Sequence, residues 1–306
     1  MVATILLILV GGLVRAAGAG LGCPDWPQCF GMWIPPTSAA ELPAGYDASL
    51  FNPLHTWLEY VNRLIGVLIG LLITATFVIS FQYRKTDPAV TVASGIAFVL
   101  VLFQGWLGGQ VVKSGLHAGM ITIHMVVAMF ILSTLLYASF RAMNERLKIE
   151  IPKKVKRNLL WLGGGIFFLT MVQMVLGTQV RESVDFAKNV LELPRESWID
   201  ATDWIYTVHR SFSWLVVICA IGLLYYNRKE DVPNRLQTTS WVIAALILFQ
   251  IFLGVGMERL GMPGVMQILH LVSVSILICA ELLLMLMARF AQELSLIHIS
   301  EPTRPY

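Results

Sequence analysis

Residues 103–113 read FQGWLGGQVVK and residues 249–259 read FQIFLGVGMER, so one pattern recurs 146 residues further along the chain. The same spacing carries His124 onto His270. A fixed long period is the sign of an internal repeat and should be sought before single segments are assigned. The chain is therefore predicted to be a tandem duplication.

The composition predicts that this repeat lies in a membrane. Of the 306 residues, 57% are hydrophobic and only 13% are charged, against about 25% charged residues in an ordinary soluble domain. A helix needs about 20 apolar residues to cross the roughly 30 Å of hydrocarbon in a bilayer. Such runs are expected at 55–82, 89–112, 118–140, 159–180, 204–227, 238–258 and 264–290, with a shorter one at 2–14.

Basic residues predict the orientation of the spans, because cytoplasmic loops carry an excess of Lys and Arg. The loop at 16–54 has no Lys or Arg, so it is expected outside the cytoplasm, together with 181–203. Eight spans follow, in a cell membrane, with both termini in the cytoplasm. The net charge of +3 is thus a topology signal and does not indicate nucleic-acid binding. The basic residues of the alternate loops are Arg84, Lys85, Arg141, Arg146, Lys148, Lys153, Lys154, Lys156, Arg157, Arg228, Lys229 and Arg235.

The two halves of the repeat, 1–145 and 146–292, each contain four predicted spans. An even number of spans gives both halves the same orientation, which makes the repeat parallel. The predicted fold is an all-α integral membrane protein, in which eight transmembrane helices form two tandem four-helix bundles related by a pseudo-two-fold axis. We expect the native chain to begin several residues earlier. Residues 293–306 resemble a translated sequencing adapter, so His298 has no predicted role.

Three histidines lie inside predicted spans, where an ionisable side chain is costly and usually functional. His124, His209 and His270 each lie about five to seven residues from the outer end of a span, roughly 8 to 10 Å below the outer surface. His209 and His270 are expected to face each other across the second bundle as axial ligands of a haem iron. The alternative is that each histidine only hydrogen-bonds a neighbouring helix.

Cations near the outer ends of the spans also follow the repeat. We expect them to pair with the carboxylates of outward-pointing haem propionates. The alternative is that their long side chains reach the lipid headgroups. The functional role is favoured for Arg63 and Arg210, which lie deeper. The six residues, paired by the repeat, are Arg15 with Arg181, Arg63 with Arg210, and Lys113 with Arg259.

Other polar residues within the spans have structural interpretations. Gln104 and Gln250, beside Gly108 and Gly254, are expected to allow close helix packing and to form an interhelical hydrogen bond. Glu281 lies deeper in the last span, and we do not assign it to a proton or quinone path.

Four cysteines divide into two pairs. Cys23 and Cys29 lie in the first outer loop, whereas Cys219 and Cys279 lie inside apolar spans and are predicted core residues. An extracytoplasmic compartment permits a disulfide. We expect a Cys23–Cys29 disulfide rather than free thiols or a metal site, since a zinc site would need a second ligand pair.

Several segments together resemble the haem A synthase family. The resemblance covers residues 1 to about 290, and the first-loop motif with its two cysteines is its most diagnostic part. It implies a duplicated eight-span protein that oxidises the C8 methyl of haem O to a formyl group, giving haem A. It also implies a permanently bound haem b in the C-terminal half and the substrate haem in the N-terminal half. The segments are GGLVRAAGAGLGCPDWPQCFG at 11–31, EYVNR at 59–63, ITIHM around His124, TVHRS around His209 and QILHL around His270.

Carried over by position, the resemblance implies that His209 and His270 bind the haem b iron and that His124 binds the substrate iron. Glu59 matches the family's acidic residue in the second span. Its carboxylate is expected to accept a proton from the hydroxylated methyl group, or to stabilise positive charge on that carbon. The alternative is a structural ion pair between Glu59 and Arg63, four residues further on.

Asn62 departs from the family pattern, which more often has histidine at this position. With His124 alone, the substrate iron would be five-coordinate or weakly ligated, and an open position is what oxygen activation needs. His55 and His117 precede Asn62 and His124 by seven residues, two helical turns outward on the same faces, and are alternative ligands for a shifted haem. Otherwise Asn62 is a catalytic residue beside Glu59 that hydrogen-bonds water or a bound intermediate.

The sequence thus predicts a membrane oxidoreductase, a haem A synthase with haem b as cofactor and haem O as substrate. The alternative is a dihaem electron-transfer protein of cytochrome b type, which should have two matched histidine pairs. A repeat transporter should break its spans with Gly or Pro near the midplane, whereas the prolines here lie in loops or at span ends. Expected partners are the lipid bilayer, haem O synthase, an electron acceptor such as a quinone, and further copies of the chain.

Overall fold

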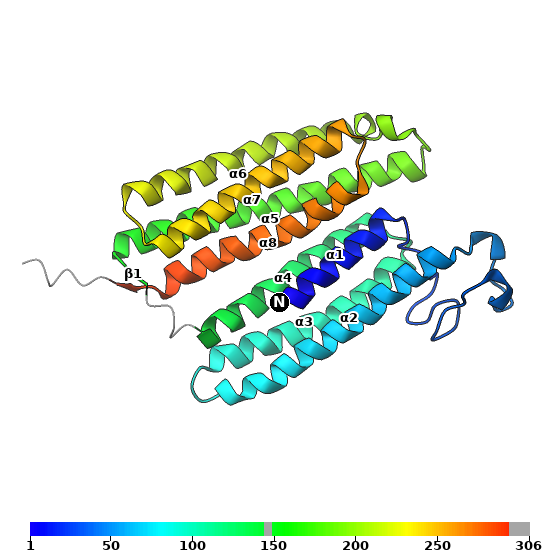
Figure 1. Ribbon diagram of the computed structural model, residues 1–306, viewed down its shortest axis with the longest axis horizontal. Coiled ribbons are helices and arrows are strands. Elements are labelled where there is room, and N and C mark those ends of the chain that lie inside the picture. Colours follow the sequence, from blue (N-terminus) through cyan, green and yellow to red (C-terminus); the bar gives the residue numbers. More distant parts are fainter. Residues whose placement is uncertain (144–148, 294–306) are drawn as a thin grey trace, which may run out of the picture.

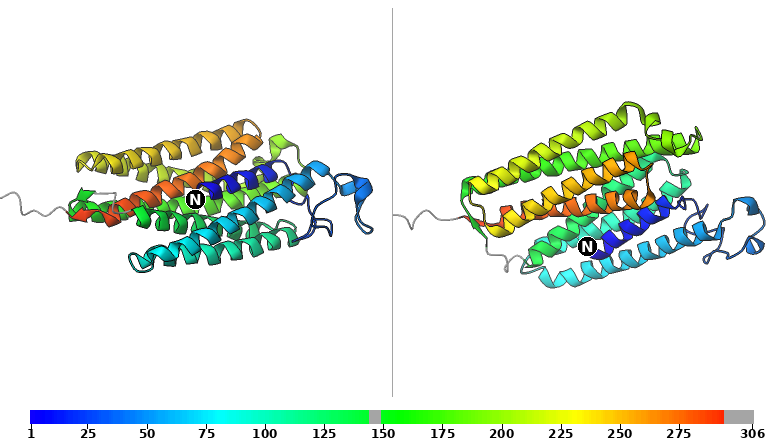
Figure 2. Two further views of the ribbon diagram at one scale, coloured as in Figure 1. Left: turned by 60° about the horizontal axis from the view of Figure 1, so that its bottom comes forward. Right: turned by 45° about the horizontal axis from the view of Figure 1, so that its top comes forward.

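The computed structural model describes residues 1–143 and 149–293, and this part of the chain is almost entirely helical (Figures 1 and 2). Arg146, Lys148 and His298 lie outside the described residues. The long helices run side by side, joined at both ends of the molecule. They are α1 (Val2–Ala16), α2 (Pro53–Ser80), α3 (Pro88–Lys113), α4 (Ala118–Met143), α5 (Lys153–Asn189), α6 (Asp203–Lys229), α7 (Asn234–Arg259) and α8 (Gly264–Phe290).

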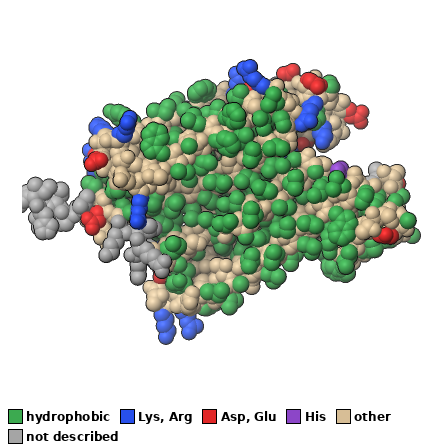
Figure 3. Space-filling model, viewed as in Figure 1, with side chains coloured by type: hydrophobic (Ala, Val, Ile, Leu, Met, Phe, Trp, Pro, Cys, Tyr) green, Lys and Arg blue, Asp and Glu red, His purple; other side chains and the backbone are tan. Residues whose placement is uncertain are grey.

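Within the described ranges, seven helices, α2 to α8, are long and apolar enough to cross a bilayer. α1 has 15 residues and is shorter than these. On the face seen in Figure 3, hydrophobic side chains cover the middle of the molecule and charged side chains gather toward its two ends. This distribution matches a hydrocarbon core between two polar surfaces. The chain is therefore an all-helical, multi-pass membrane protein.

Helix α5 departs most from its predicted extent. The sequence predicts a span at 159–180 and an outer loop at 181–203, but the helix runs from Lys153 to Asn189. An ion pair of 2.9 Å between Arg181 and Asp185, one turn apart, stabilises the added outer turns. The loop prediction is wrong for residues 181–189, because a change from apolar to polar sequence can end a span without ending its helix.

Helix α8 lies at the junction of the two halves. α5 and α7 each pack against both α6 and α8, which closes a four-helix group around one core. In the N-terminal half, α2 packs between α1 and α3, and α3 packs against α4. α8 also contacts α1 and α4. Among the candidate spans it is the most enclosed, since 56% of its apolar window is buried against 17–28% in the others.

Short strands close the end of the molecule where α4 is followed by α5. β1 (Glu150–Ile151) pairs in parallel with β2 (Gln292–Glu293), which ties the start of α5 to the end of α8. Of the predicted adapter-like tail at 293–306, only Glu293 belongs to the described residues.

The loop between α1 and α2 folds over the start of α2 and the end of α3. Phe30 packs edge-on against Tyr46 and Phe51, with ring centroids 5.2 and 5.5 Å apart. On α3, a Cβ added to Gly109 would lie 2.8 Å from the Trp26 ring, so Trp26 rests directly on this helix. The loop thus packs on its own aromatic side chains and, through Trp26, against α3.

Replacement of Gly22 by alanine is expected to displace this loop. A Cβ at Gly22 would lie 2.2 Å from the carbonyl oxygen of His55, and that backbone belongs to α2. Overpacking of this kind typically costs about 1–3 kcal/mol, so thermal unfolding in detergent should show a lowered midpoint. Gly70→Ala is the control, because nothing lies within 4 Å of the added Cβ and alanine favours the helix. Equal midpoints for the two variants would contradict this packing.

Candidate functional site

Each of the three histidines predicted as haem ligands has its backbone carbonyl oxygen bound by a glutamine of a neighbouring helix. The interhelical hydrogen bonds expected for Gln104 and Gln250 are confirmed. Gln173 was missed, because the segments aligned by the repeat do not include it. The bonds, from Nε2 to O, join Gln104 to His124 at 3.0 Å, Gln173 to His209 at 2.8 Å and Gln250 to His270 at 2.9 Å.

The imidazole rings of these histidines have unused hydrogen-bonding capacity. Nδ1 of His124, His209 and His270 is buried and has no hydrogen-bond partner in the part of the chain that the structure describes. Buried polar atoms are nearly always paired in native proteins, so each unpaired one requires an explanation. His209 on α6 and His270 on α8 belong to the same four-helix group, and each ring keeps this unpaired nitrogen. Two histidines of one apolar four-helix group, each with an unpaired ring nitrogen, fit the donor set of a bis-His haem.

Glycines lie against two of the rings. A Cβ at Gly177 on α5 would lie 3.2 Å from Cε1 of His209, and one at Gly108 on α3 would lie 3.5 Å from Cε1 of His124. The absence of a side chain at these positions leaves room for the rings to turn. Gly177 therefore leaves space for the His209 ring, in addition to any role in helix packing.

The repeat predicted from the sequence aligns Asn62 on α2 with His209 on α6. A Cβ at Gly11 would lie 4.0 Å from Oδ1 of Asn62, so Gly11 faces Asn62 as Gly177 faces His209. If the α1 and α5 segments are aligned on these two glycines, Leu7 takes the place of Gln173. The histidine and its supporting glutamine are thus both absent from this corner of the N-terminal half.

Glu59 and Arg63 form the ion pair that the sequence left as an alternative. The Arg63 Nε donates to Glu59 Oε1 at 3.0 Å, and both side chains are largely buried, with 13% and 8% exposed. Arg63 also donates to backbone carbonyls of the first loop, at Asp25 (2.8 Å), Gln28 (2.9 Å) and Cys23 (3.3 Å). Glu59 Oε2 makes no hydrogen bond to any described residue. One carboxylate oxygen is therefore committed to Arg63, while the other is free to meet a ligand.

The remaining cations divide by environment. Arg15 on α1 and Arg181 on α5 both bind Asp185, at 3.1 and 2.9 Å, so this carboxylate joins the two halves. Arg15 Nη1 and Arg181 Nε are buried without a partner among the described residues. Arg210 is 64% exposed and pairs with Glu258 at 3.1 Å. Lys113 and Arg259 end α3 and α7 and are exposed. Asp185 and Glu258 were not predicted from the sequence. The repeat was used to match cations between the halves, and acidic partners for these cations were not sought.

The two alternative histidines differ in position. His55 lies half-buried in the first turn of α2. His117 precedes α4, which begins at Ala118, and is exposed; its Nδ1 accepts a hydrogen bond from the Gly119 N–H at 3.2 Å. Its carbonyl oxygen accepts a hydrogen bond from the Ile121 N–H at 3.2 Å, so His117 lies at the very start of the helix that carries His124. Its role as an alternative ligand stays a prediction.

Cys23 and Cys29 form the expected disulfide, and both are buried beside Phe30 under the loop. It closes a short loop, for which chain entropy predicts about 2 kcal/mol of stabilisation. Replacing both cysteines by serine should therefore lower the thermal midpoint in detergent. The double variant Cys219→Ala/Cys279→Ala removes the two free thiols instead and serves as the control. A serine variant as stable as the parent would show that the disulfide contributes nothing.

Glu281 lies fully buried on α8. Its Oε1 accepts a hydrogen bond of 2.7 Å from the hydroxyl of Thr170 on α5, and Oε2 has no partner among the described residues. The hydrogen bond joins α5 and α8, which gives Glu281 an interhelical contact consistent with a structural role.

Comparison with known proteins gives a consistent match. A family model for cytochrome oxidase assembly proteins, COX15-CtaA, matches residues 1–282. A protein named Heme A synthase from Shewanella oneidensis is 28% identical over 299 residues, which cover 88% of each chain. One from Bartonella quintana is 23% identical and covers 81% of this chain and 79% of its own. One from Paracoccus denitrificans is 24% identical and covers 86% and 76%.

Proposed function

The chain belongs to the haem A synthase family that the COX15-CtaA model describes, and from this premise we propose that it is itself a haem A synthase. It is an oxidoreductase that acts on haem O and oxidises the C8 methyl group to a formyl group by successive hydroxylations. The observation that carries this proposal is the asymmetry of the halves. Two histidines, His209 on α6 and His270 on α8, lie in the C-terminal half, whereas His124 is matched by Asn62 in the N-terminal half.

We propose that α1 is an eighth span and that residues 1–145 and 146–292 form two four-helix halves related by a parallel pseudo-two-fold repeat. The matched glutamine-to-carbonyl bonds of His124 and His270 support this relation. So do the matched contacts of Gly11 and Gly177 with positions 62 and 209. The basic residues of the alternate loops support cytoplasmic termini, with the haem sites toward the outer face.

The C-terminal half is the proposed site of haem b, where His209 and His270 would hold the iron. Bound there, haem b would supply one-electron transfer between the substrate side and an external acceptor such as a quinone. Gln173 and Gln250 bind the carbonyl oxygens of the two ligands and so fix their stretches of helix.

The N-terminal half is the proposed site of haem O. His124 binds the substrate iron, and Asn62 leaves the opposite side without a histidine. Glu59 is placed by Arg63, which holds one carboxylate oxygen and leaves Oε2 available. That oxygen serves as the base that accepts a proton from the hydroxylated methyl group, or stabilises positive charge on its carbon.

Propionate binding is proposed for the cations of the outer ends. Arg15 and Arg181 are the best placed, because each keeps a buried guanidinium nitrogen without a partner despite the shared Asp185. Arg63, Arg210, Lys113 and Arg259 remain candidates, although Arg63 already has four hydrogen bonds. Association with haem O synthase and with further copies of the chain stays a prediction.

Expression with a supply of haem O tests the function directly. Extracted haems are separated by chromatography and identified by mass. A haem A synthase should yield haem A, with haem b in the purified protein. Recovery of haem b beside unchanged haem O would reject the synthase and favour the dihaem electron carrier of cytochrome b type.

A further inference from the structure

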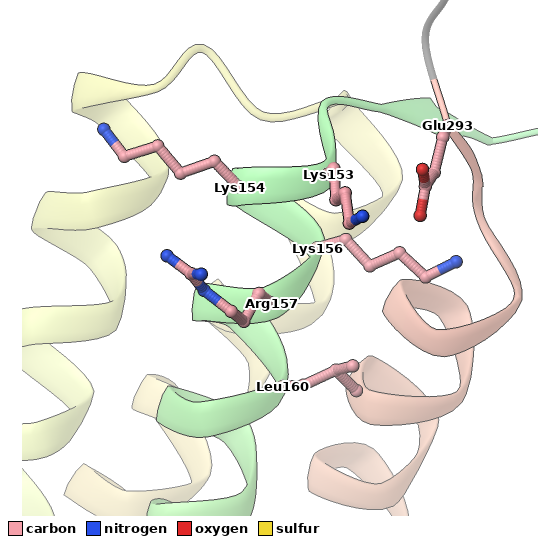
Figure 4. A pocket seen from close by; sticks show the side chains of 6 residues that line it. All are labelled: Lys153, Lys154, Lys156, Arg157, Leu160 and Glu293. Atoms are coloured by element: carbon pink, nitrogen blue, oxygen red, sulfur yellow. The ribbon is translucent and has the colours of Figure 1, made fainter.

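Four cations surround a hollow at the end of α5 that lies opposite the first loop. The hollow has a volume of about 530 Å³ (Figure 4). Lys154 and Arg157 extend to one side of α5, whereas Lys153 and Lys156 extend to the other side, where Glu293 lies. None of the four cations forms an ion pair with a described residue. The lining residues are Lys153, Lys154, Lys156, Arg157, Leu160 and Glu293.

The charges at this site are only partly balanced by the protein. Lys156 Nζ donates to the carbonyl oxygen of Ala291 at 2.9 Å, which fixes it against the end of α8. Lys153, Lys154 and Arg157 are exposed. All four lie in the first turns of a long helix, where unpaired N–H groups and the macrodipole already favour negative charge. The Pro152 N-cap offers no side-chain hydrogen bond. An anion at this position would therefore reduce the repulsion among the cations and between them and the free N–H groups at the start of α5.

The apolar residues that follow distinguish a lipid from a soluble anion. Lys154, Arg157 and Trp161 are spaced i, i+3 and i+7, so they share one face of α5. Trp161 is 78% exposed, and one turn of helix, about 5.4 Å, separates it from the level of Arg157. Tryptophan beside basic residues is typical of the boundary between headgroups and acyl chains.

We propose that the start of α5 binds the phosphate headgroup of an anionic phospholipid, with Lys153, Lys154 and Arg157 around the phosphate and the acyl chains along Leu160 and Trp161. The site needs only that α5 crosses the membrane. It is independent of the haem chemistry, so failure of either proposal leaves the other untouched.

The test uses the purified full chain in neutral detergent and native mass spectrometry. Phosphatidylglycerol and phosphatidylcholine of matched chain length are titrated in turn. The parent should retain one phosphatidylglycerol in preference to phosphatidylcholine. The variant Lys153→Gln/Lys154→Gln/Arg157→Gln should bind phosphatidylglycerol on the order of 100-fold more weakly, since each cation near a headgroup contributes about fivefold. Lys156 is kept because it also holds α8.

The matched control is Arg84→Gln/Lys85→Gln/Lys229→Gln, which removes three exposed cations from the other basic loops. It should retain phosphatidylglycerol. Equal loss in both triple variants would reduce the effect to general surface charge and overturn the site, as would full retention by the α5 variant. Displacement of the lipid by millimolar inorganic phosphate would also overturn it, in favour of a soluble anion. If the triple variant does not fold, Arg157→Gln alone should weaken retention about fivefold.

Discussion

Purified His270→Ala protein is expected to lack the haem b absorption of the parent chain. His270 supplies one of two proposed axial ligands, and its Nδ1 has no partner among the described residues that could keep the ring in place by other means. Outer-shell partners of a metal ligand typically account for about 10- to 100-fold in affinity. Loss of a ligand itself should therefore weaken haem binding by at least about 100-fold. Visible absorption and the pyridine haemochrome assay of purified protein measure the bound haem.

Three further variants define the specificity of this result. His209→Ala should lose haem b in the same way. His124→Ala should retain haem b but lose binding of haem O, because it belongs to the other half. His117→Ala is the control, since His117 is exposed and precedes α4. Full haem b content in both His209→Ala and His270→Ala would reject the bis-His site.

Glu59→Gln should leave haem b bound while blocking aldehyde formation. The amide keeps the shape of the side chain and an acceptor for Arg63 Nε, so the loop carbonyls bound by Arg63 should stay in place. It loses the ability to accept a proton. Positioned general bases contribute about 10² to 10⁴-fold to rate, so haem A should fall by that factor in extracts from cells supplied with haem O.

Glu258→Gln is the matched control for Glu59→Gln. Glu258 also pairs with an arginine, Arg210, but this pair belongs to the C-terminal half, and its side chains are 64% (Arg210) and 32% (Glu258) exposed. Its neutralisation should leave haem A formation near the level of the parent. If Glu59→Gln loses haem b and haem A together, the Glu59–Arg63 pair is a structural support for the loop and the catalytic assignment fails.

The helices were largely predictable from the sequence, because each depends on a local run of apolar residues. The observed bounds of α2, α3, α4, α7 and α8 lie within a few residues of the predicted runs. The error in α5 has a local cause as well. Hydropathy indicates where a span ends, whereas helix formation continues through polar residues that pair within the helix, as Arg181 and Asp185 do.

The candidate site was predictable in its residue types but only partly in its contacts. The repeat selects His124, His209 and His270 because their spacing survives in one dimension. It gives no information about the partners of Arg63, whose four bonds include three to carbonyls 35 to 40 residues away in the first loop. The packing of the loop on α2 decides whether Arg63 binds a haem propionate or the carbonyl groups of the loop. The spacing of residues along the sequence does not give this packing.

By itself, the sequence determined the class of the protein, its long helices, the disulfide pair and the histidines, since apolar runs and residue spacing act locally along the chain. Only the tertiary structure decided that α8 joins the two halves, that Asp185 binds Arg15 from 170 residues away, and that Gln173 supports His209. The physical reason is that these contacts join helices far apart in sequence. The residues that make these contacts become neighbours only when the helices pack and their buried polar groups form hydrogen bonds.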